Sequence, residues 1–240
     1  MEIDPWPGLE LGDPLGGGSR SEVWAGLHNG QRAVVRQSRR SAASLEWELD
    51  LMDTLAAHGF VVPAAIPTDD GRRSVDGLVV QTWIDGRPPI SDDDWRLVAT
   101  ELQRLHTVGR DHRQRPECCV VTEIHDTRRS VDADLDSLPT QVAALVLAEF
   151  ASVAHVGRSL IHGDPGPENL RITAQGRVGL LDWDESRVDV VWHDLSNLGV
   201  QVLDDDTHGR AERLSHAWEA ANGWTTEPEY ARRRLAALDQ

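Results

Sequence analysis

Hydrophobic residues in the first third of the chain alternate with polar ones over short runs separated by turn residues. Because side chains along a strand point to opposite faces in turn, this alternation predicts strands. The predicted strands are 9–12, 22–27, 32–37 and 78–84. Leu45, Leu49, Met52 and Ala56 instead recur at helical spacing, which predicts a helix over 41–57. Glu48 falls on the same face as Met52, so we expect it to point inward.

The pattern becomes helical after Pro88-Pro89. Ser91 to Asp94 form a capping box, which predicts the start of a helix that ends near His106. Further along we expect a helix over 140–156, short strands over 170–173 and 178–181, and mostly helix from about residue 190.

These elements predict an α+β fold of two lobes. The N-terminal lobe, 1–87, would hold an antiparallel sheet with one helix and bind a nucleotide. A hinge is expected at about 81–88, and a mostly helical C-terminal lobe, 88–240, would carry the catalytic loop and the substrate site.

The composition narrows the choice of partners. The formal net charge of −16 argues against nucleic acid, whose phosphates attract basic surfaces, and weakly favours a cationic small molecule. No stretch approaches the roughly 20 apolar residues of a membrane helix, so we expect a soluble, cytoplasmic protein, a monomer or a homodimer. All 24 basic residues are arginine, which excludes any mechanism that requires lysine.

The segment from His162 to Asn169 combines groups that suit phosphoryl transfer. This chemistry needs Mg²⁺ on hard oxygen ligands, a group that orients the attacking hydroxyl and accepts its proton, and positive charge on the phosphates. Asp164 follows an apolar run, where a base would face a cleft. Asn169 offers an amide oxygen to Mg²⁺, and Asp182 ends a predicted strand and offers a carboxylate to the same ion.

These residues form the pattern H-G-D-x-x-x-x-N, followed by an aspartate after an apolar strand and then by Trp192-His193-Asp194-Leu195. The pattern resembles the phosphotransferase superfamily typified by aminoglycoside and choline kinases, distant relatives of protein kinases. The resemblance implies a bilobal, protein-kinase-like fold and an alcohol group as phosphate acceptor. It also implies a catalytic base at Asp164, metal ligands at Asn169 and Asp182, and a supporting role for His162.

Two features of the N-terminal lobe suit the phosphates of ATP or GTP. Gly17, Gly18 and Ser19 lie between the first two predicted strands, where backbone N–H groups and a hydroxyl would approach phosphate. Kinases of this type carry a lysine in the third strand, and this chain has Arg36 there. Strand alternation would place Arg36 at the phosphates and Val34 over the base, with Glu48 as the ion-pair partner of Arg36.

The connector after the fourth strand, which includes Gln81 and Trp83, is expected to meet the edge of the base. Trp83 is equally consistent with a core position. No Walker A sequence occurs, so a P-loop fold is excluded.

The acceptor is expected to be a small molecule. Only eleven residues separate Asp182 from Asp194, too few for the activation segment of a protein kinase. Asp184 and Glu185 would face an amine-bearing substrate, so the favoured hypothesis is an antibiotic-modifying enzyme that acts on aminoglycosides or similar compounds. A metabolic kinase of a sugar, a choline-like alcohol or an amino alcohol stays open.

Two other classes are open as well. Arg36 in place of lysine suits a nucleotide-binding protein without useful catalysis, and assays of ATP hydrolysis would separate it from an active kinase. A metal-dependent hydrolase would use His162, Asp164, Asp182 and His193 as ligands. A tightly bound transition metal would support that reading.

Overall fold

The computed structural model of the protein describes residues 3–16 and 21–239. The chain forms two compact units. The first comprises Met1–Pro88 and Glu168–Asp184, and the second comprises Pro89–Pro167 and Glu185–Gln240. The sequence pattern assigned 168–184 to the helical lobe, but these residues pack with the first unit. The division into functional lobes stays a prediction.

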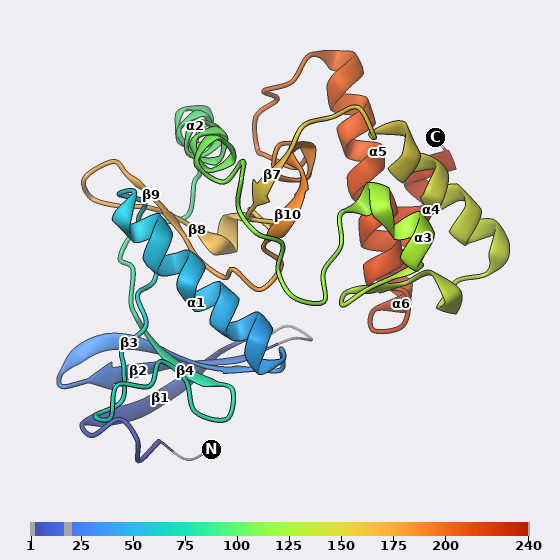
Figure 1. The fold of residues 1–240 in the computed structure, drawn as a ribbon. Coiled ribbons are helices and arrows are strands. Elements are labelled where there is room, and N and C mark those ends of the chain that lie inside the picture. The colour runs from blue at the N-terminus through green and yellow to red at the C-terminus, as the bar shows by residue number, and fades with distance from the viewer. Residues whose placement is uncertain (1–2, 17–20, 240) are drawn as a thin grey trace. The chain divides into compact units, whose positions relative to one another are not determined.

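The first unit is built on an antiparallel sheet with the strand order β1-β2-β3-β4 (Figure 1). Its strands are β1 (Leu9–Gly16), β2 (Ser21–His28), β3 (Gln31–Ser38) and β4 (Leu78–Thr82). In the β3–β4 pair Val34 lies opposite Gln81, so these two side chains share a face of the sheet. Val35 and Val80, one position away, fill the core on the other face.

Helix α1 (Ala42–Ala57) lies beside this sheet (Figure 1). Ser41 caps its start by accepting a hydrogen bond from the backbone N–H of Ser44, which satisfies one of the unpaired donors of the first turn. Leu45, Leu49 and Met52 are buried along one side of the helix, as their spacing predicts. The prediction that Glu48 points inward is confirmed, since it is only 1% exposed.

Residues 168–184 form the hairpin of β8 (Leu170–Ile172) and β9 (Val178–Leu180). The hairpin is bonded to the rest of the first unit at both strands. The N–H of Leu180 donates to the carbonyl of Val61 at 2.9 Å, and Ile172 exchanges two backbone hydrogen bonds with Arg87. These bonds explain why the segment joins the first unit, although it follows 79 residues of the second.

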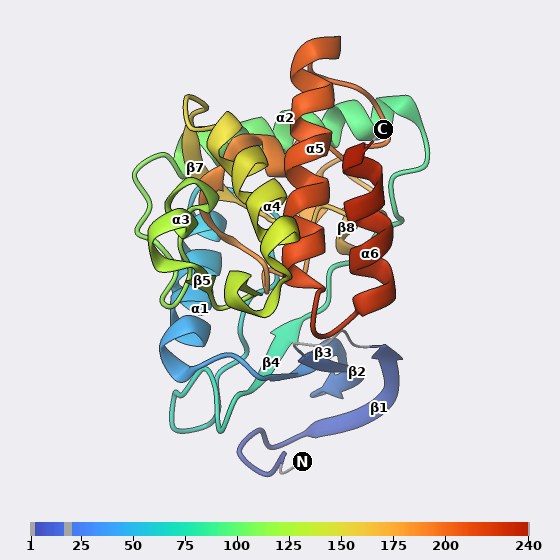
Figure 2. The same cartoon turned by 90° about the vertical axis from the view of Figure 1, so that its right-hand side faces the viewer.

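The second unit begins with α2 (Asp92–Val108), and its predicted capping box of Ser91 and Asp94 is confirmed. A two-stranded antiparallel sheet joins β7 (Arg158–Ile161) to β10 (Arg187–Val190). Its longer C-terminal helices are α4 (Thr140–Ser152), α5 (Asp205–Asn222) and α6 (Pro228–Ala236). Helix α5 packs between α4 and α6, which Figure 2 shows side by side. Phe150, Leu214 and Trp218 lie in the core between them.

Two stretches of the second unit differ from the sequence expectation. Residues 121–138 form short elements that the pattern did not indicate, namely α3 (Ile124–Thr127), β5 (Arg129–Ser130), β6 (Ala133–Asp134) and the 3-10 turns Val121–Glu123 and Leu135–Ser137. Residues 195–204 contain no helix, although the chain from 190 was expected to be mostly helical. Runs this short carry too few periods to be recognised by spacing.

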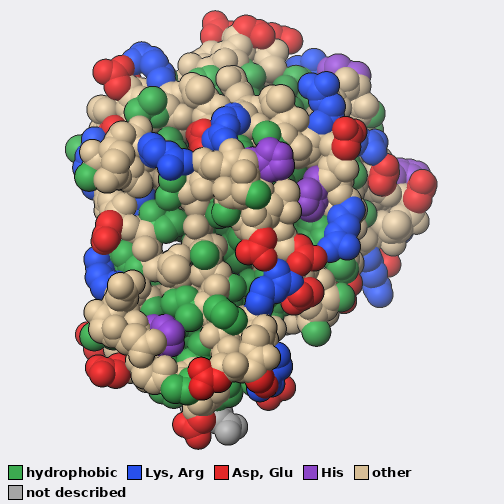
Figure 3. Space-filling view, turned by 60° about the vertical axis from the view of Figure 1, so that its left-hand side comes forward, with side chains coloured by type: hydrophobic (Ala, Val, Ile, Leu, Met, Phe, Trp, Pro, Cys, Tyr) green, Lys and Arg blue, Asp and Glu red, His purple; other side chains and the backbone are tan. Residues whose placement is uncertain are grey.

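Charged side chains of both signs are interspersed on the surface drawn in Figure 3. Arg73, for example, forms ion pairs with Asp50 at 2.7 Å and Asp53 at 2.8 Å, and also with Glu46. Such pairs reduce repulsion among the acidic residues. No helix within residues 3–16 and 21–239 is both long and apolar enough to cross a membrane.

Candidate functional site

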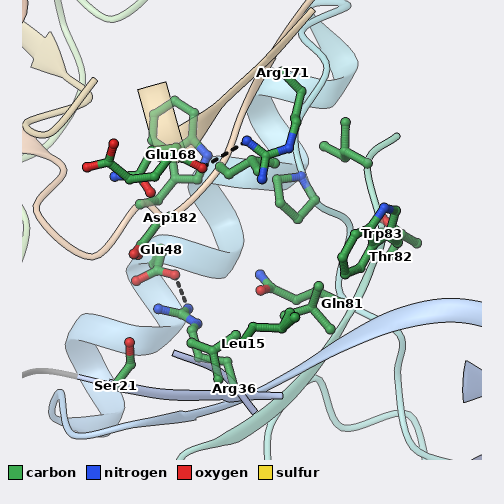
Figure 4. A pocket seen from close by; sticks show the side chains of 17 residues that line it. Leu15, Ser21, Arg36, Glu48, Gln81, Thr82, Trp83, Glu168, Arg171 and Asp182 are labelled. Carbon is green, nitrogen blue, oxygen red and sulfur yellow. Dashed lines mark hydrogen bonds and ion pairs between the residues drawn. The ribbon is translucent and has the colours of Figure 1, made fainter. Parts of the chain in front are cut away.

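A pocket of about 340 Å³ lies entirely within the first unit. Leu15, Val23 and Val34 come to it from the sheet, and Gln81 and Trp83 from the end of β4 and the connector after it. The hairpin segment contributes Asn169, Arg171 and Asp182, and α1 contributes Glu48. Figure 4 shows Gln81 and Arg36 reaching toward the space from one side and Asp182 from the other. Apolar walls with a few convergent polar groups are typical of a small-molecule site.

Arg36 and Glu48 form a buried ion pair at the pocket (Figure 4). The pairing predicted from the sequence is therefore confirmed. Burial by itself would lower the pKa of Arg36, but the charges of Glu48, Asp184 and Asp182 outweigh it and raise that pKa, so the guanidinium stays charged. Its Nε and Nη1 are buried without a hydrogen-bond partner among the described residues. Two unused charged donors at a pocket suit an anionic group such as phosphate.

Asn169 and Asp182 stand at the two ends of the hairpin and both line the pocket. The backbone joins these ends, because Leu181 N–H donates to the Asn169 carbonyl at 2.9 Å. Asp182 adopts a φ of 51°, in the left-handed region that costs a residue other than glycine roughly 1–2 kcal/mol. One amide and one carboxylate oxygen are the hard ligands that Mg²⁺ prefers, and the spare donors of Arg36 suit its phosphate partner. The pocket therefore fits a magnesium-bound polyphosphate.

Polar and aromatic side chains form the part of the pocket near β4. Gln81 is only 6% exposed, and its amide nitrogen lies 3.5 Å from the sulfur of Met52, a weak contact. Trp83 is half-buried at the pocket, not a core residue, and the guanidinium of Arg32 lies 3.8 Å from the centroid of its ring. Val34 lines the same pocket as Arg36, as strand alternation predicts.

The loop that carries Asp164 follows β7 in the second unit. Its shape depends on Asp194, a fully buried residue of the 3-10 turn Val191–Asp194. The Asp194 carboxylate accepts hydrogen bonds from the N–H groups of His162 and Gly163, each at 2.8 Å, and lies 2.9 Å from Nε2 of His106. Burial would raise the pKa of Asp194, but the hydrogen bond from His106 and the nearby histidine charges hold it below its usual range.

Gly163 has a φ of 94°, and a Cβ there would lie 2.5 Å from the carbonyl oxygen of Glu185. Only glycine fits this turn without displacing the backbone. Asp164, the next residue, is exposed, and its N–H donates to Nδ1 of buried His162 at 3.4 Å. The loop thus holds His162 inside and presents Asp164 at the surface of the second unit.

Asp184 and Glu185 lie in different environments. Asp184 is 5% exposed, and its carboxylate Oδ1 accepts a hydrogen bond from Nε of Arg40 at 3.1 Å. This carboxylate faces arginine, an environment unlike the substrate contact expected from the sequence. Glu185 is half-buried in the second unit, next to the Asp164 loop. Gly17, Gly18 and Ser19 lie outside the described residues.

Residues 12–236, nearly the whole chain, match the model of a family described as the phosphotransferase enzyme family. The chain belongs to this phosphotransferase family. Membership confirms the predicted phosphotransferase family.

Sequence relatives of the phosphotransferase include homoserine kinases. The chain is 32% identical over 117 residues to the homoserine kinase of Burkholderia ambifaria (strain MC40-6), and the match covers 43% of the chain. It is 33% identical over 115 residues to that of Burkholderia cenocepacia (strain HI2424), again over 43% of the chain. The alignments cover 35% of each relative, so the chain spans about a third of the length of these curated proteins.

Solved structures show the fold over almost the full chain. The gentamicin complex of APH(2")-IIa gives a TM-score of 0.64 at 17% identity and covers 96% of this chain and 91% of that one. Choline kinase LicA from Streptococcus pneumoniae gives 0.66 at 15% identity, covering 96% and 92%. A microcompartment-associated aminopropanol kinase gives 0.64 at 18%, covering 96% and 89%. These likenesses confirm the predicted α+β, protein-kinase-like fold.

The hydrolase alternative gains no support from this phosphotransferase. No group of three or more His, Cys, Asp or Glu side chains able to hold a metal occurs in the described part of the chain. His193, one of the ligands that this alternative would use, is buried. The ring packs edge-on against Trp218, with centroids 5.9 Å apart, which is a core environment.

Three residues are absent from the candidate set drawn from the sequence, although each contacts the Asp164 loop, the pocket or a neighbour of Asp182. Asp194 was noticed as part of a motif, but its bonds to the Asp164 loop were not foreseen. Arg171 lines the pocket, with Nη1 bound to the carbonyls of Glu168 and Leu170. Arg40 gave no signal, because its partner Asp184 lies 144 positions away.

Proposed function

We propose that this protein is an ATP-dependent small-molecule kinase that transfers the γ-phosphate to a hydroxyl of an amine-bearing acceptor. The favoured acceptor is an aminoglycoside or another antibiotic. The observation that carries the proposal is the buried Arg36, which brings two unused charged donors to the pocket that Asn169 and Asp182 also line. A guanidinium buried in this way gains from an anionic ligand that can accept its hydrogen bonds.

In this proposal Asn169 and Asp182 hold Mg²⁺, and Arg36 binds the phosphates while Glu48 fixes its orientation. Bound Mg²⁺ would neutralise charge on the phosphates of ATP. Val34, Gln81 and Trp83 form the wall against the base, and GTP is the alternative donor. Asp164 orients the acceptor hydroxyl and takes its proton, while Asp194 keeps the loop in shape through the N–H groups of His162 and Gly163. A glycine-rich turn at Gly17, Gly18 and Ser19 would cover the phosphates.

A metabolic acceptor is the second candidate, and the sequence match to homoserine kinases favours it. Homoserine joins a hydroxyl to an amine, as does the aminopropanol of a structural neighbour. Both candidates therefore share an acceptor with at least one cationic nitrogen and at least one hydroxyl group, which agrees with the acidic character of the chain. Antibiotic resistance would follow from the first candidate alone. The predicted cytoplasmic location applies to both candidates.

An acceptor screen tests this proposal. Purified protein would be incubated with ATP or GTP, Mg²⁺ and a panel of aminoglycosides, macrolides, choline, aminopropanol and homoserine, and phosphorylated products would be detected by mass spectrometry. We expect at least one amine-bearing alcohol to gain a phosphate. Binding of nucleotide without transfer to any acceptor would favour the non-catalytic alternative, which the substitution of lysine by Arg36 suggests.

Two variants test the assigned roles. Asp164→Asn should lower the transfer rate about 10³-fold, because the amide cannot accept the proton, while the Kd for Mg-ATP changes little. Asp182→Ala should instead abolish the gain in ATP affinity that Mg²⁺ provides. Calorimetric titration with ATP measures both binding effects. Full transfer activity in Asp164→Asn would contradict the role of Asp164 as the base.

A further inference from the structure

Arg40 is hydrogen-bonded to Asp184, the residue two positions beyond Asp182. It lies between β3 and α1, and its side chain is 5% exposed. Nε donates to the Asp184 carboxylate at 3.1 Å, and Nη2 donates to the Asp184 backbone carbonyl at 2.6 Å. One rigid guanidinium therefore holds both the side chain and the main chain of Asp184. A contact of this kind fixes the path of the backbone as well as neutralising a charge.

The main chain at Asp184, which Arg40 holds, is continuous with the segment that orients Asp182. Asp182 has the left-handed φ of 51°, a conformation that persists only where its surroundings impose it. On its N-terminal side, Leu181 N–H is bonded to the Asn169 carbonyl at 2.9 Å. On its C-terminal side, the Trp183 ring is buried and donates to the Leu180 carbonyl at 3.2 Å, and Asp184 is held by Arg40. Asp182 thus lies between anchored neighbours on both sides.

The same contact affects Arg36. Nη1 of Arg36 lies 3.9 Å from the Asp184 carboxylate, close enough to feel its charge but too far for a hydrogen bond. The Oδ1 atom nearest to Arg36 is the one that accepts from Arg40. Arg40 therefore holds this oxygen away from hydrogen-bond distance of Arg36, whose Nη1 remains without a hydrogen-bond partner among the described residues.

We infer that Arg40 is a positioning residue of the pocket. Acting through Asp184, it holds Asp182 in the orientation that binds Mg²⁺ and leaves Arg36 available to phosphate. The inference rests on the proposed function, because it concerns the metal and phosphate groups of the same pocket. It also assigns Asp184 to Arg40 and not to the acceptor.

The test measures how ATP affinity responds to Mg²⁺. Calorimetric titrations of wild type, Arg40→Met and Arg40→Lys with ATP would be run in EDTA and over a series of Mg²⁺ concentrations. We expect Arg40→Met to raise the Mg²⁺ concentration for half-maximal tightening about tenfold, as is usual when a residue that supports a metal ligand is lost. Arg40→Lys keeps the charge but cannot bind the Asp184 carboxylate and the Asp184 carbonyl together, so its response to Mg²⁺ should be intermediate. Affinity in EDTA should change less.

Arg39→Met is the matched control, because Arg39 is the neighbouring arginine and pairs with Glu22 at the surface, where both side chains are more than half exposed. Its Mg²⁺ response should equal that of wild type. The double variant Arg40→Met/Asp184→Asn separates positioning from stability. Removing both charges should restore much of the thermal stability lost in Arg40→Met, because no carboxylate stays buried without its arginine. The Mg²⁺ response should stay impaired, since the grip on the backbone is still absent.

Three outcomes are decisive. A Mg²⁺ response that returns to wild type in the double variant would overturn the inference and leave Arg40 a purely structural partner of Asp184. A wild-type response in folded Arg40→Met would overturn it as well, while the proposed function stood. A wild-type protein that bound no ATP, with or without Mg²⁺, would instead overturn the proposed function and this inference with it.

Discussion

Each unit of this phosphotransferase contains a buried carboxylate beside a basic partner, Glu48 with Arg36 in the first and Asp194 with His106 in the second. The two clusters differ in how many of their polar atoms are hydrogen-bonded. In the second unit, the Asp194 oxygens accept hydrogen bonds from two loop N–H groups, and one of them also contacts His106. In the first unit, Arg36 is bound to Glu48 but keeps Nε and Nη1 without hydrogen-bond partners among the described residues. The Asp194 cluster is complete within its own unit, and the Arg36 cluster is not.

One cluster thus satisfies its hydrogen bonds internally, and the other keeps two donors without partners among the described residues. Buried polar groups cost free energy unless they are hydrogen-bonded, so native proteins rarely leave charged donors unused. Asp194 satisfies this requirement internally and sets the shape of the Asp164 loop. No described residue accepts hydrogen bonds from Nε and Nη1 of Arg36, and the proposed phosphate ligand would do so. Three experiments test these assignments.

The largest effect is expected from Asp194→Ala. Removing the carboxylate leaves the N–H groups of His162 and Gly163 without their acceptor, and breaking a buried charged cluster in this way costs about 4 kcal/mol of unfolding free energy. Urea denaturation would measure the loss. Asp204→Ala is the control, because Asp204 is an exposed cap of α5 whose removal should cost far less. Equal losses in the two variants would show that the Asp194 cluster is not special.

The next largest effect is expected in the stability at acid pH. Burial lowers the pKa of His193 to about 4 in the folded protein. As the pH falls below about 6.5, His193 therefore becomes protonated in the unfolded chain before it does in the folded one. Stability should therefore fall between pH 6.5 and 4, and His193 should account for about 3 kcal/mol of that loss. Urea denaturation of His193→Phe over this range should show a shallower decline. His125→Gln, at an exposed residue, should decline as wild type does. Parallel curves for wild type and His193→Phe would refute the assignment.

The smallest effect is expected from Arg36→Met. Losing charged hydrogen bonds to phosphate should weaken Mg-ATP binding by about 2 kcal/mol, or roughly 30-fold. Thermal stability should fall too, because Glu48 stays buried without its cation. Arg32→Met removes an exposed pair with Asp85 and should change neither quantity much. Unchanged Mg-ATP affinity in folded Arg36→Met would show that the unused donors do not serve the ligand.

Much of the first unit was predictable because local periodicity sets which face a side chain occupies. A strand period of two put Val34 and Arg36 on one side of β3, and a helical period put Glu48 on the inner side of α1. Both faces are now seen to meet at the Arg36–Glu48 pair. The short elements over 121–138 were not predicted because each spans only about one period of a helix or strand.

The environment of Asp184 was not predictable from spacing. A carboxylate next to a metal-ligand candidate suggested contact with an amine-bearing substrate, yet it is 5% exposed and bound to Arg40. Nothing local marks Arg40, since the two residues come from distant parts of the chain. The left-handed backbone of Asp182 was not predictable either, because the residue type alone does not indicate the φ that an aspartate adopts. The roles of Gly17, Gly18 and Ser19 stay predictions.

Residue types and local spacing in the sequence indicated the family, the order of the candidate site residues and the side of each strand or helix on which they stand. These properties depend on residue type and on neighbours a few positions apart, which a single chain displays directly. Which charges are neutralised depends instead on how the folded chain brings distant residues together. Pairing and burial arise from contacts between residues far apart in the chain. These contacts occupy Asp184 and Asp194 and leave two donors of Arg36 without a partner among the described residues.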